Sequence, residues 1–481
     1  MAKLTDLPAE LVISIIHYVF DANQASLRQQ ITPLTGHHYL DHTQINCAGE
    51  PKPRPHEERI RLLAKAYKVP QVYREQVSWP KGLPSNPLLP LALVNRTFRQ
   101  CAQELLFKNV DLHNTRIANV FLKSLTACDY GLSSQRRKRF NHPTRLSQYV
   151  RSLQFTWGDS RLPGKSSATL FCKILQSCPL LENIDISNKF LLTCKESILE
   201  ALASKPFIKE FVLSHDTNRT SLTFQWPPAE IVSRLFSHWN LLETVELSAL
   251  SGCPHESNPS TQPAPNSIPV LNCAIRTMIL VNHELDELTV SNLLKSCGES
   301  MRTLHITGPH THLNPEAFGR VLQDSTCPNL ECLIVHDTGR WEHWKNPIID
   351  SDLDGPFTVP GLLDTVFDSP IALRKLKTLS FDGEKMATNR LLARLPKSLV
   401  KLSMENSRIA ASALIKALTI NSGHNDGLLP NLTCLSVYDP RKWSSKDEKA
   451  VQEVVELRGG CAHIYCDHKL FASPSPSNVA F

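Results

Sequence analysis

Four potential zinc ligands lie close together near the C-terminal end of the sequence, in the segment CAHIYCDH. They are Cys461, His463, Cys466 and His468. Thiolates and imidazoles are ligands that Zn²⁺ prefers in proteins. However, Cys461, Ile464 and Cys466 also continue the apolar spacing of a strand, and cysteine often behaves as a small buried hydrophobic residue. We therefore predict a strand with two buried cysteines here and no metal site.

A second segment lies where a phosphate-binding loop would lie, but its spacing is wrong. The sequence FTWGDSRLPGKSS runs from Phe155 to Ser167, between a predicted strand and a predicted helix. Five residues separate Gly158 from Gly164, whereas the loop needs four, and Pro163 removes a backbone donor. The serine hydrolase, zincin and dinucleotide-binding patterns are also absent from the sequence. We predict that the chain is not an enzyme and needs no cofactor.

The composition limits the class of protein further. The 481 residues carry a formal net charge of +6, which is lower than the strongly positive charge typical of a nucleic-acid-binding protein. The basic run Arg136–Arg139 is interpreted as part of a solvated linker. The 14 cysteines are scattered without a CxxC pair, which favours a reducing compartment. Since no run of 18 apolar residues occurs, we expect no membrane partner and a location in the cytoplasm and/or nucleus.

Two amphipathic helices are predicted near the N-terminus. The first begins in LTDLPAELVISIIHYV, where Asp6 can cap the helix and Pro8 suits its first turn. Its apolar stripe consists of Leu11, Ile15, Ile16 and Val19. The second lies within residues 88–112, and its stripe consists of Leu91, Val94, Phe98, Leu105 and Phe107. Each stripe needs an apolar partner surface.

The body of the chain is a repeat. The pattern apolar-x-x-apolar-x-apolar occurs ten times between Val150 and Val437, at intervals of 23 to 46 residues. Segments with helical spacing separate the units, for example residues 166–179. A short strand backed by one helix cannot bury its apolar face alone, so neighbouring units are expected to stack around one continuous core.

The N-terminal helices resemble a split F-box of the fungal type. The matching residues are Leu7, Pro8, Glu10, Leu11, Ile15, Tyr18, Leu93, Val94, Arg96 and Phe98. The resemblance places an F-box at residues 1–112, with an insertion at about 21–87. It implies two roles for six residues: some contact a Skp-type adaptor, and others hold the helices that contact it. These residues are Leu7, Pro8, Leu11, Ile15, Val94 and Phe98. An ordinary helix pair that caps the next domain is the alternative.

Residues 145–470 resemble a leucine-rich-repeat domain, best seen in CPLLENIDIS and CPNLECLIVHD. The resemblance implies an α/β fold in which the small helical F-box precedes an irregular solenoid, or horseshoe, of alternating strands and helices. A basic linker is expected at 113–144, loops at about 251–270 and 338–357, and a disordered tail at 471–481. A generic α/β protein with a parallel sheet is the alternative.

Target binding is expected on the concave strand face, where residues between the core positions point to solvent. These residues are Asp185, Glu246, His305, His336, Asp382, Glu405 and Tyr438. The strip is acidic to neutral, so we expect a partner with a basic or polar surface. Solvated strand positions without a binding role are the alternative.

The two resemblances together imply the substrate-recognition subunit of an SCF-type cullin-RING E3 ubiquitin ligase. The F-box would bind a Skp-type adaptor and, through it, a cullin, while the repeats would bind a target protein. Tethering raises the effective concentration of the target near the ubiquitin-loaded enzyme, so the chain itself needs no catalytic residue. The alternative is a non-catalytic interaction scaffold that acts outside a ligase, and a nucleic-acid-binding regulator ranks last.

Overall fold

The computed structural model describes the repeat region in most detail. The described residues are 7–16, 18–19, 88–112, 114–127, 145–155, 165–187, 191–214, 227–248, 250, 268, 271–309, 312–336, 341, 360–369, 371–419, 428–438 and 443–465. The predicted insertion at about 21–87, the Arg136–Arg139 run, most of the two predicted loops and the predicted tail lie outside the described residues.

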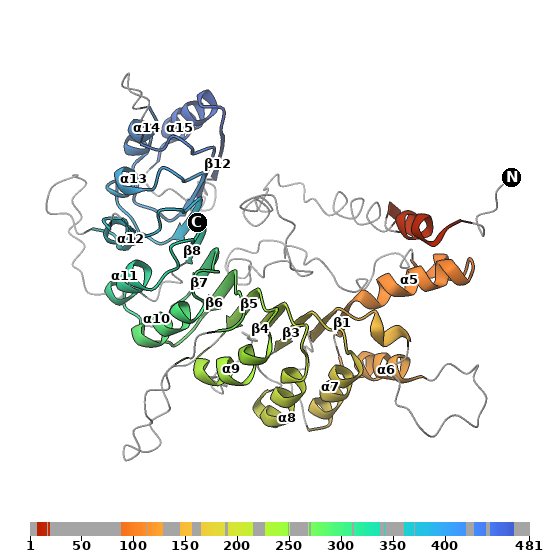
Figure 1. Ribbon diagram of the computed structural model, residues 1–481. Helices are drawn as coiled ribbons and strands as arrows, with labels where there is room; N and C mark the ends of the chain where they lie inside the picture. Colours follow the sequence, from red (N-terminus) through yellow and green to blue (C-terminus); the bar gives the residue numbers. More distant parts are fainter. Residues whose placement is uncertain are drawn as a thin grey trace, which may run out of the picture. The chain divides into compact units, whose positions relative to one another are not determined.

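Twelve strands form a sheet in which the strand order follows the chain order (Figure 1). The strands are β1 (Asn109–Leu112), β2 (Ser152–Phe155), β3 (Asn183–Ser187), β4 (Glu210–Ser214), β5 (Thr244–Ser248), β6 (Thr277–Val281), β7 (Thr303–Thr307), β8 (Cys332–His336), β9 (Thr378–Asp382), β10 (Lys401–Glu405), β11 (Cys434–Tyr438) and β12 (Cys461–Tyr465). Every strand pair whose register is described is parallel. The ten predicted repeat strands are confirmed as β2 to β11, and the strand predicted at Cys461 is β12.

Helices separate these strands, as the repeat pattern predicts, except that none is described between β5 and β6. They are α4 (Leu88–Leu91), α5 (Arg96–Lys108), α6 (Thr115–Thr126), α7 (Lys165–Ser177), α8 (Leu191–Ala203), α9 (Pro228–Arg234), α10 (Glu287–Ser296), α11 (Pro315–Asp324), α12 (Leu362–Val366), α13 (Leu391–Arg394), α14 (Ala411–Thr419) and α15 (Ser445–Leu457). Two 3₁₀ helices are η3 (Arg145–Gln148) and η5 (Phe236–His238). Residues 9–16 and 18–19 are also helical.

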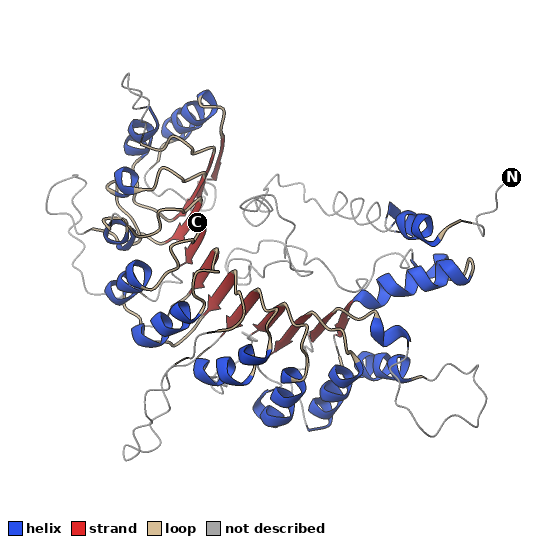
Figure 2. Ribbon diagram, viewed as in Figure 1, coloured by secondary structure: helices blue, strands red, loops and turns tan. Residues whose placement is uncertain are grey.

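The chain divides into two compact units, each described here by itself. One contains Met1–Phe224 and Arg234–Val245, and the other contains Gln225–Ser233 and Glu246–Phe481. In each unit the repeat helices lie along one side of the strands (Figure 2). No described repeat helix covers the opposite side, which we call the helix-free face. Side chains alternate between the two sides along every strand.

Apolar side chains in matching strand positions form the core on the helix side. Leu153, Ile184 and Phe211 are neighbours in register on β2, β3 and β4, and all three are fully buried. Burying one such side chain stabilises the fold by roughly 1.5–3 kcal/mol. Each repeat therefore depends on its neighbours to remove its strand residues from water.

The sheet begins earlier than the sequence analysis placed it. Residues 109–112 were assigned to the N-terminal helices, but they form β1, where Val110 pairs in register with Leu153 of β2. Residues 115–126 of the predicted basic linker form α6, which begins at the N-cap Asn114. The repeat architecture thus starts directly after α5, and the predicted boundary at residue 112 falls at the end of the first strand.

Left-handed backbone turns close several strands of the second unit. Four residues that directly follow a strand have positive φ, and each donates its backbone N–H to the last residue of the next strand. They are Asn282, Gly308, Gly383 and Asn406. For example, the N–H of Asn282 lies 2.8 Å from the carbonyl oxygen of Thr307. Glycine and asparagine adopt this conformation at the least steric cost, so they suit the turn that sets the register.

Three buried tryptophans tie neighbouring repeats together. Each donates its indole N–H to a backbone carbonyl 28 to 37 residues earlier in the chain. The pairs are Trp239 to Leu202 at 3.3 Å, Trp341 to Leu313 at 3.2 Å, and Trp443 to Ile409 at 2.9 Å. A buried carbonyl needs such a partner because water cannot reach it.

Replacing Trp443 by phenylalanine should lower the free energy of unfolding by about 1–3 kcal/mol, because the carbonyl of Ile409 loses its buried donor. Urea unfolding followed by circular dichroism measures this change. The control is Leu457→Ala, whose side chain is 86% exposed and should change stability by less than about 0.5 kcal/mol. Equal effects of the two variants would contradict the role of the indole hydrogen bond.

Candidate functional site

The N-terminal helices pack around a small apolar core of their own. Asn95 caps α5 by accepting a hydrogen bond from the backbone N–H of Phe98 at 2.9 Å. The core of this helix pair consists of Val12, Ile16, Leu88, Phe98, Cys101 and Ala102. Leu7, Leu91 and Leu105 pack against it as partly buried residues. We call this assembly the N-terminal helix pair.

A strip of large apolar side chains on the first helix stays exposed. Leu11, Ile15 and Tyr18 lie at i, i+4 and i+7, which places them on one side of the helix. Leu11 is 52% exposed and Tyr18 is 76% exposed. We call these three residues the N-terminal apolar strip. In the turn after α4, Leu93 and Val94 are also exposed.

The structure separates the predicted adaptor residues into two groups. Pro8, Leu11, Ile15 and Val94 are exposed, whereas Leu7 is half-buried and Phe98 lies in the core of the helix pair. The stripe predicted for the first helix was therefore partly wrong. Ile16 faces the core, as does Val12, which the sequence analysis missed, while Leu11 and Ile15 face outward. The i, i+4 spacing of Val12 and Ile16 is the signal that could have found this second face.

The predicted target-binding residues all lie on strands and alternate with core positions, which places them on the helix-free face. The prediction that they point to solvent is wrong for Asp185, Glu246 and Tyr438, which are buried. Adjacent strands lie only about 4.8 Å apart, so side chains in one row shield one another. Asp185, for example, accepts a hydrogen bond from the Gln154 side chain of β2 at 2.9 Å.

In the second unit, four predicted target residues are half-buried and lie near one another. His336, Asp382 and Glu405 are direct neighbours in register on β8, β9 and β10. We call these three residues the polar row. His305 joins them on β7, where its ring lies 5.4 Å from the ring of His336. Its Nε2 is also 2.8 Å from the hydroxyl oxygen of Thr307.

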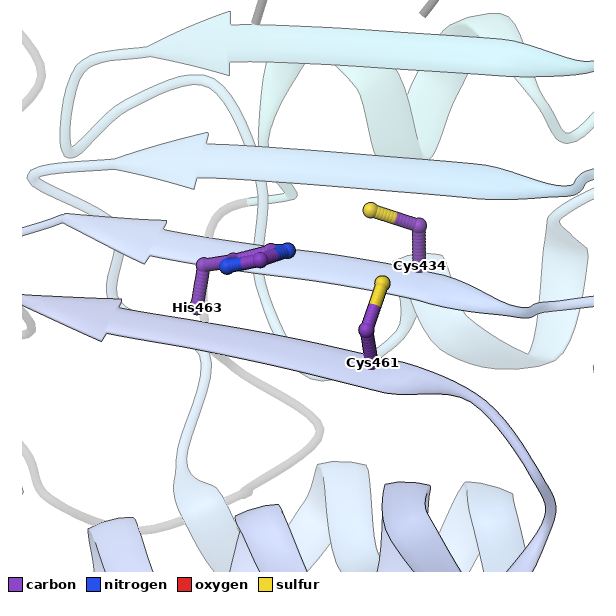
Figure 3. Close-up of side chains that lie close together, drawn as sticks. All are labelled: Cys434, Cys461 and His463. Atoms are coloured by element: carbon purple, nitrogen blue, oxygen red, sulfur yellow. The ribbon is translucent and has the colours of Figure 1, made fainter. Parts of the chain in front are cut away.

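A cluster of two thiols and one imidazole lies at the end of the sheet. Cys434 of β11 and Cys461 of β12 are neighbours in register, and His463 follows two residues later on β12. Figure 3 shows that the three side chains extend on the same side of the two strands. Their ligand atoms all lie within 4.8 Å of one another.

The cluster corrects part of the sequence prediction. Cys461 was expected to be buried, but it is exposed, because it lies on the helix-free face of the last strand. Cys466 and His468 lie outside the described residues. Cys434 is buried, and burial raises the pKa of its thiol to about 11, with a smaller contribution from a hydrogen bond with Cys461. Cys434 and Cys461 each hold the first position of their strand, and this shared position is the signal that could have predicted their contact.

Other cysteines fill the core, as the scattered pattern predicted. Burial raises the pKa of Cys178 to about 12, and it raises the pKa of Cys297 to about 12 as well. These thiols stay protonated at neutral pH. A protonated thiol is a poor nucleophile, so neither residue has the properties of a catalytic cysteine.

The alternation of strand and helix, with parallel strands in chain order, defines a leucine-rich-repeat solenoid. The chain is similar to a chain in the structure of the Rad7 and Elc1 complex of yeast. The two chains are 15% identical with a TM-score of 0.37, and the match covers 76% of this chain and 86% of the yeast chain. This chain is also similar to the leucine-rich-repeat-containing protein LegL7 from Legionella pneumophila, with 12% identity, a TM-score of 0.33, and coverage of 81% and 88%. No family model and no curated protein matches the sequence. Among the described helices, none is long and apolar enough to cross a membrane.

Proposed function

We propose that this chain is the substrate-recognition subunit of an SCF-type cullin-RING E3 ubiquitin ligase in the cytoplasm and/or nucleus. The main support is the N-terminal helix pair. Val12 and Phe98 lie in its core. Leu11, Ile15 and Val94, which fit the F-box pattern, remain exposed. Grouped exposed apolar side chains are typical of a protein-binding surface.

In this proposal the N-terminal apolar strip binds a Skp-type adaptor, and the adaptor binds a cullin. Burying Leu11 or Ile15 at the interface would contribute roughly 1–2 kcal/mol each, because both side chains are only partly exposed in the unbound chain. The polar edge of the same helix, including Glu10 and Ser14, would form the rim of the interface. Polar rims around apolar centres are typical of such contacts.

The helix-free face of the repeats would bind the target protein. The polar row of His336, Asp382 and Glu405 offers two carboxylates and an imidazole on adjacent strands. The carboxylate of Asp382 already accepts a hydrogen bond from the side chain of Asn406 at 2.9 Å, so it loses little conformational entropy on binding. This arrangement favours a target segment with basic or polar side chains. The chain itself would supply no catalytic group, and its effect would come from effective concentration.

The test mixes the purified full-length chain with a Skp-type adaptor and a cullin, followed by size-exclusion chromatography. We expect the three proteins to elute together at equal stoichiometry. Elution with the adaptor but without the cullin would instead support an interaction scaffold that acts outside a ligase. Separate elution of all three proteins would contradict adaptor binding and reduce the helix pair to a cap for the repeats.

A further inference from the structure

The cluster of Cys434, Cys461 and His463 has the composition of a metal site. Parallel pairing places the first residue of β11 beside the first residue of β12, so the two thiols face each other across about 4.8 Å of backbone spacing. His463 lies two residues beyond Cys461, which returns its side chain to the same face. Figure 3 shows the imidazole ring extending along the strands toward the two sulfur atoms.

The distances suit a small tetrahedral ion. Zinc binds sulfur at about 2.3 Å and imidazole nitrogen at about 2.0 Å, so the ligand atoms of one ion lie roughly 3.5–3.8 Å apart. The three ligand atoms here lie within 4.8 Å of one another. Small rotations about the side-chain bonds close this difference, since the strand backbone already places the residues side by side.

We propose that Cys434, Cys461 and His463 bind a Zn²⁺ ion that links the last two strands. Two thiolates and one imidazole are soft to intermediate ligands, which favour zinc, whereas magnesium and calcium prefer oxygen ligands. A tetrahedral Zn²⁺ ion has four ligand positions, and these three residues fill only three of them. Because Cys461 is exposed, solvent reaches that position.

The ion would stabilise the end of the repeat array. β12 is the last strand of the described sheet, and a strand with one neighbour gains less from stacking than a strand with two. Ala462 and Ile464 of β12 are only half-buried, whereas Leu435 and Val437 of β11 are fully buried. A metal bridge from β11 to β12 replaces part of the missing stacking energy, because metal binding contributes directly to the stability of the folded state.

The test uses Co²⁺ as a spectroscopic probe for the zinc site in the full-length chain, under conditions that keep the thiols reduced. We expect a thiolate-to-cobalt charge-transfer band that saturates at one Co²⁺ per chain and disappears when Zn²⁺ is added. Zn²⁺ should also raise the melting temperature. Removing a residue that only hydrogen-bonds to a metal ligand lowers metal affinity 10–100-fold. Removing a ligand itself should cost at least as much, so we expect Cys461→Ser and His463→Gln each to weaken Zn²⁺ binding by at least about 100-fold.

The matched control is Cys332→Ser, because Cys332 holds the first position of β8, as Cys434 does in β11. This variant should keep the band and the affinity. Both test variants change residues that are exposed or half-buried, so circular dichroism should confirm that they fold. Absence of the band in the unmodified chain would overturn the proposal. An unchanged band in both test variants, or a lost band in the control, would place the ion elsewhere and also overturn it.

Discussion

Replacing Leu11 and Ile15 together by aspartate should abolish capture of a Skp-type adaptor and leave the N-terminal helix pair folded. Both side chains are exposed in the unbound chain, so the substitutions remove no core contact. At the interface, however, each aspartate would place an unpaired charge against an apolar surface, which is strongly unfavourable. We expect a loss of affinity of at least about 100-fold, since the lost burial of the two side chains together amounts to roughly 2–4 kcal/mol. Isothermal titration calorimetry with purified adaptor measures this loss.

A matched substitution on the same helix controls for the added charge. Ser14 is exposed, and its hydroxyl group donates to the carbonyl oxygen of Glu10 at 2.9 Å. Ser14→Asp should leave adaptor affinity within about threefold, because it changes a polar position at the rim. Val12→Asp, in contrast, should unfold the helix pair, since Val12 lies in its core. Full adaptor affinity in the Leu11/Ile15 double variant would count against the proposed docking surface.

Asp364→Ala should lower the free energy of unfolding by about 3–5 kcal/mol, which is the largest stability effect we expect from a polar side chain in the second unit. The carboxylate of Asp364 is completely buried in α12. It accepts hydrogen bonds from the backbone N–H of Gly361 at 2.6 Å and from the hydroxyl of Thr388 at 2.7 Å. The backbone N–H of Thr388 donates to the same carboxylate at 3.2 Å. Alanine leaves these donors without an acceptor.

The control for Asp364 lies one helical turn away. Asp368 is 69% exposed and forms an ion pair with Arg394 at 3.3 Å. An exposed ion pair contributes little, so Asp368→Ala should change stability by less than about 1 kcal/mol. Urea unfolding with tryptophan fluorescence measures both variants. If Asp364→Ala were no more destabilising than Asp368→Ala, the carboxylate would not hold the loop at Gly361 against the segment at Thr388.

The two candidate surfaces differ in how they achieve specificity. The N-terminal apolar strip offers side chains whose burial supplies affinity. The polar row of His336, Asp382 and Glu405 offers charged and hydrogen-bonding groups that select for complementary charge. A receptor of the proposed kind needs both properties, because it keeps one constant partner and selects another.

The repeat strands could be predicted because their signal is local. Each strand carries two apolar residues at i and i+2, such as Leu402 and Met404, and both are buried in the structure. The alternation of side chains along a strand converts this spacing directly into one buried face. β1 carries the same kind of apolar pair, Val110 and Leu112, but it escaped prediction because its four residues follow α5 without a break.

The inward face of the first helix was harder to predict, because both sides of it are apolar. Leu11 and Ile15 form one possible stripe, and Val12 and Ile16 form another that is rotated by about one residue. Sequence spacing cannot rank two stripes of equal hydrophobicity. Packing against Phe98 of α5 decides the question, since this contact buries Val12 and Ile16 together.

The sequence by itself determined the repeat, its strands and the alternation of apolar and polar positions, because these depend on residues within one strand or helix. The tertiary structure decided which polar positions are buried and which side chains meet. Asp185 is buried because the next strand supplies Gln154 as a partner. Cys434 meets Cys461 and His463 because parallel pairing aligns equal strand positions. Since the segments between strands vary in length, only the register of the folded sheet brings such distant residues together.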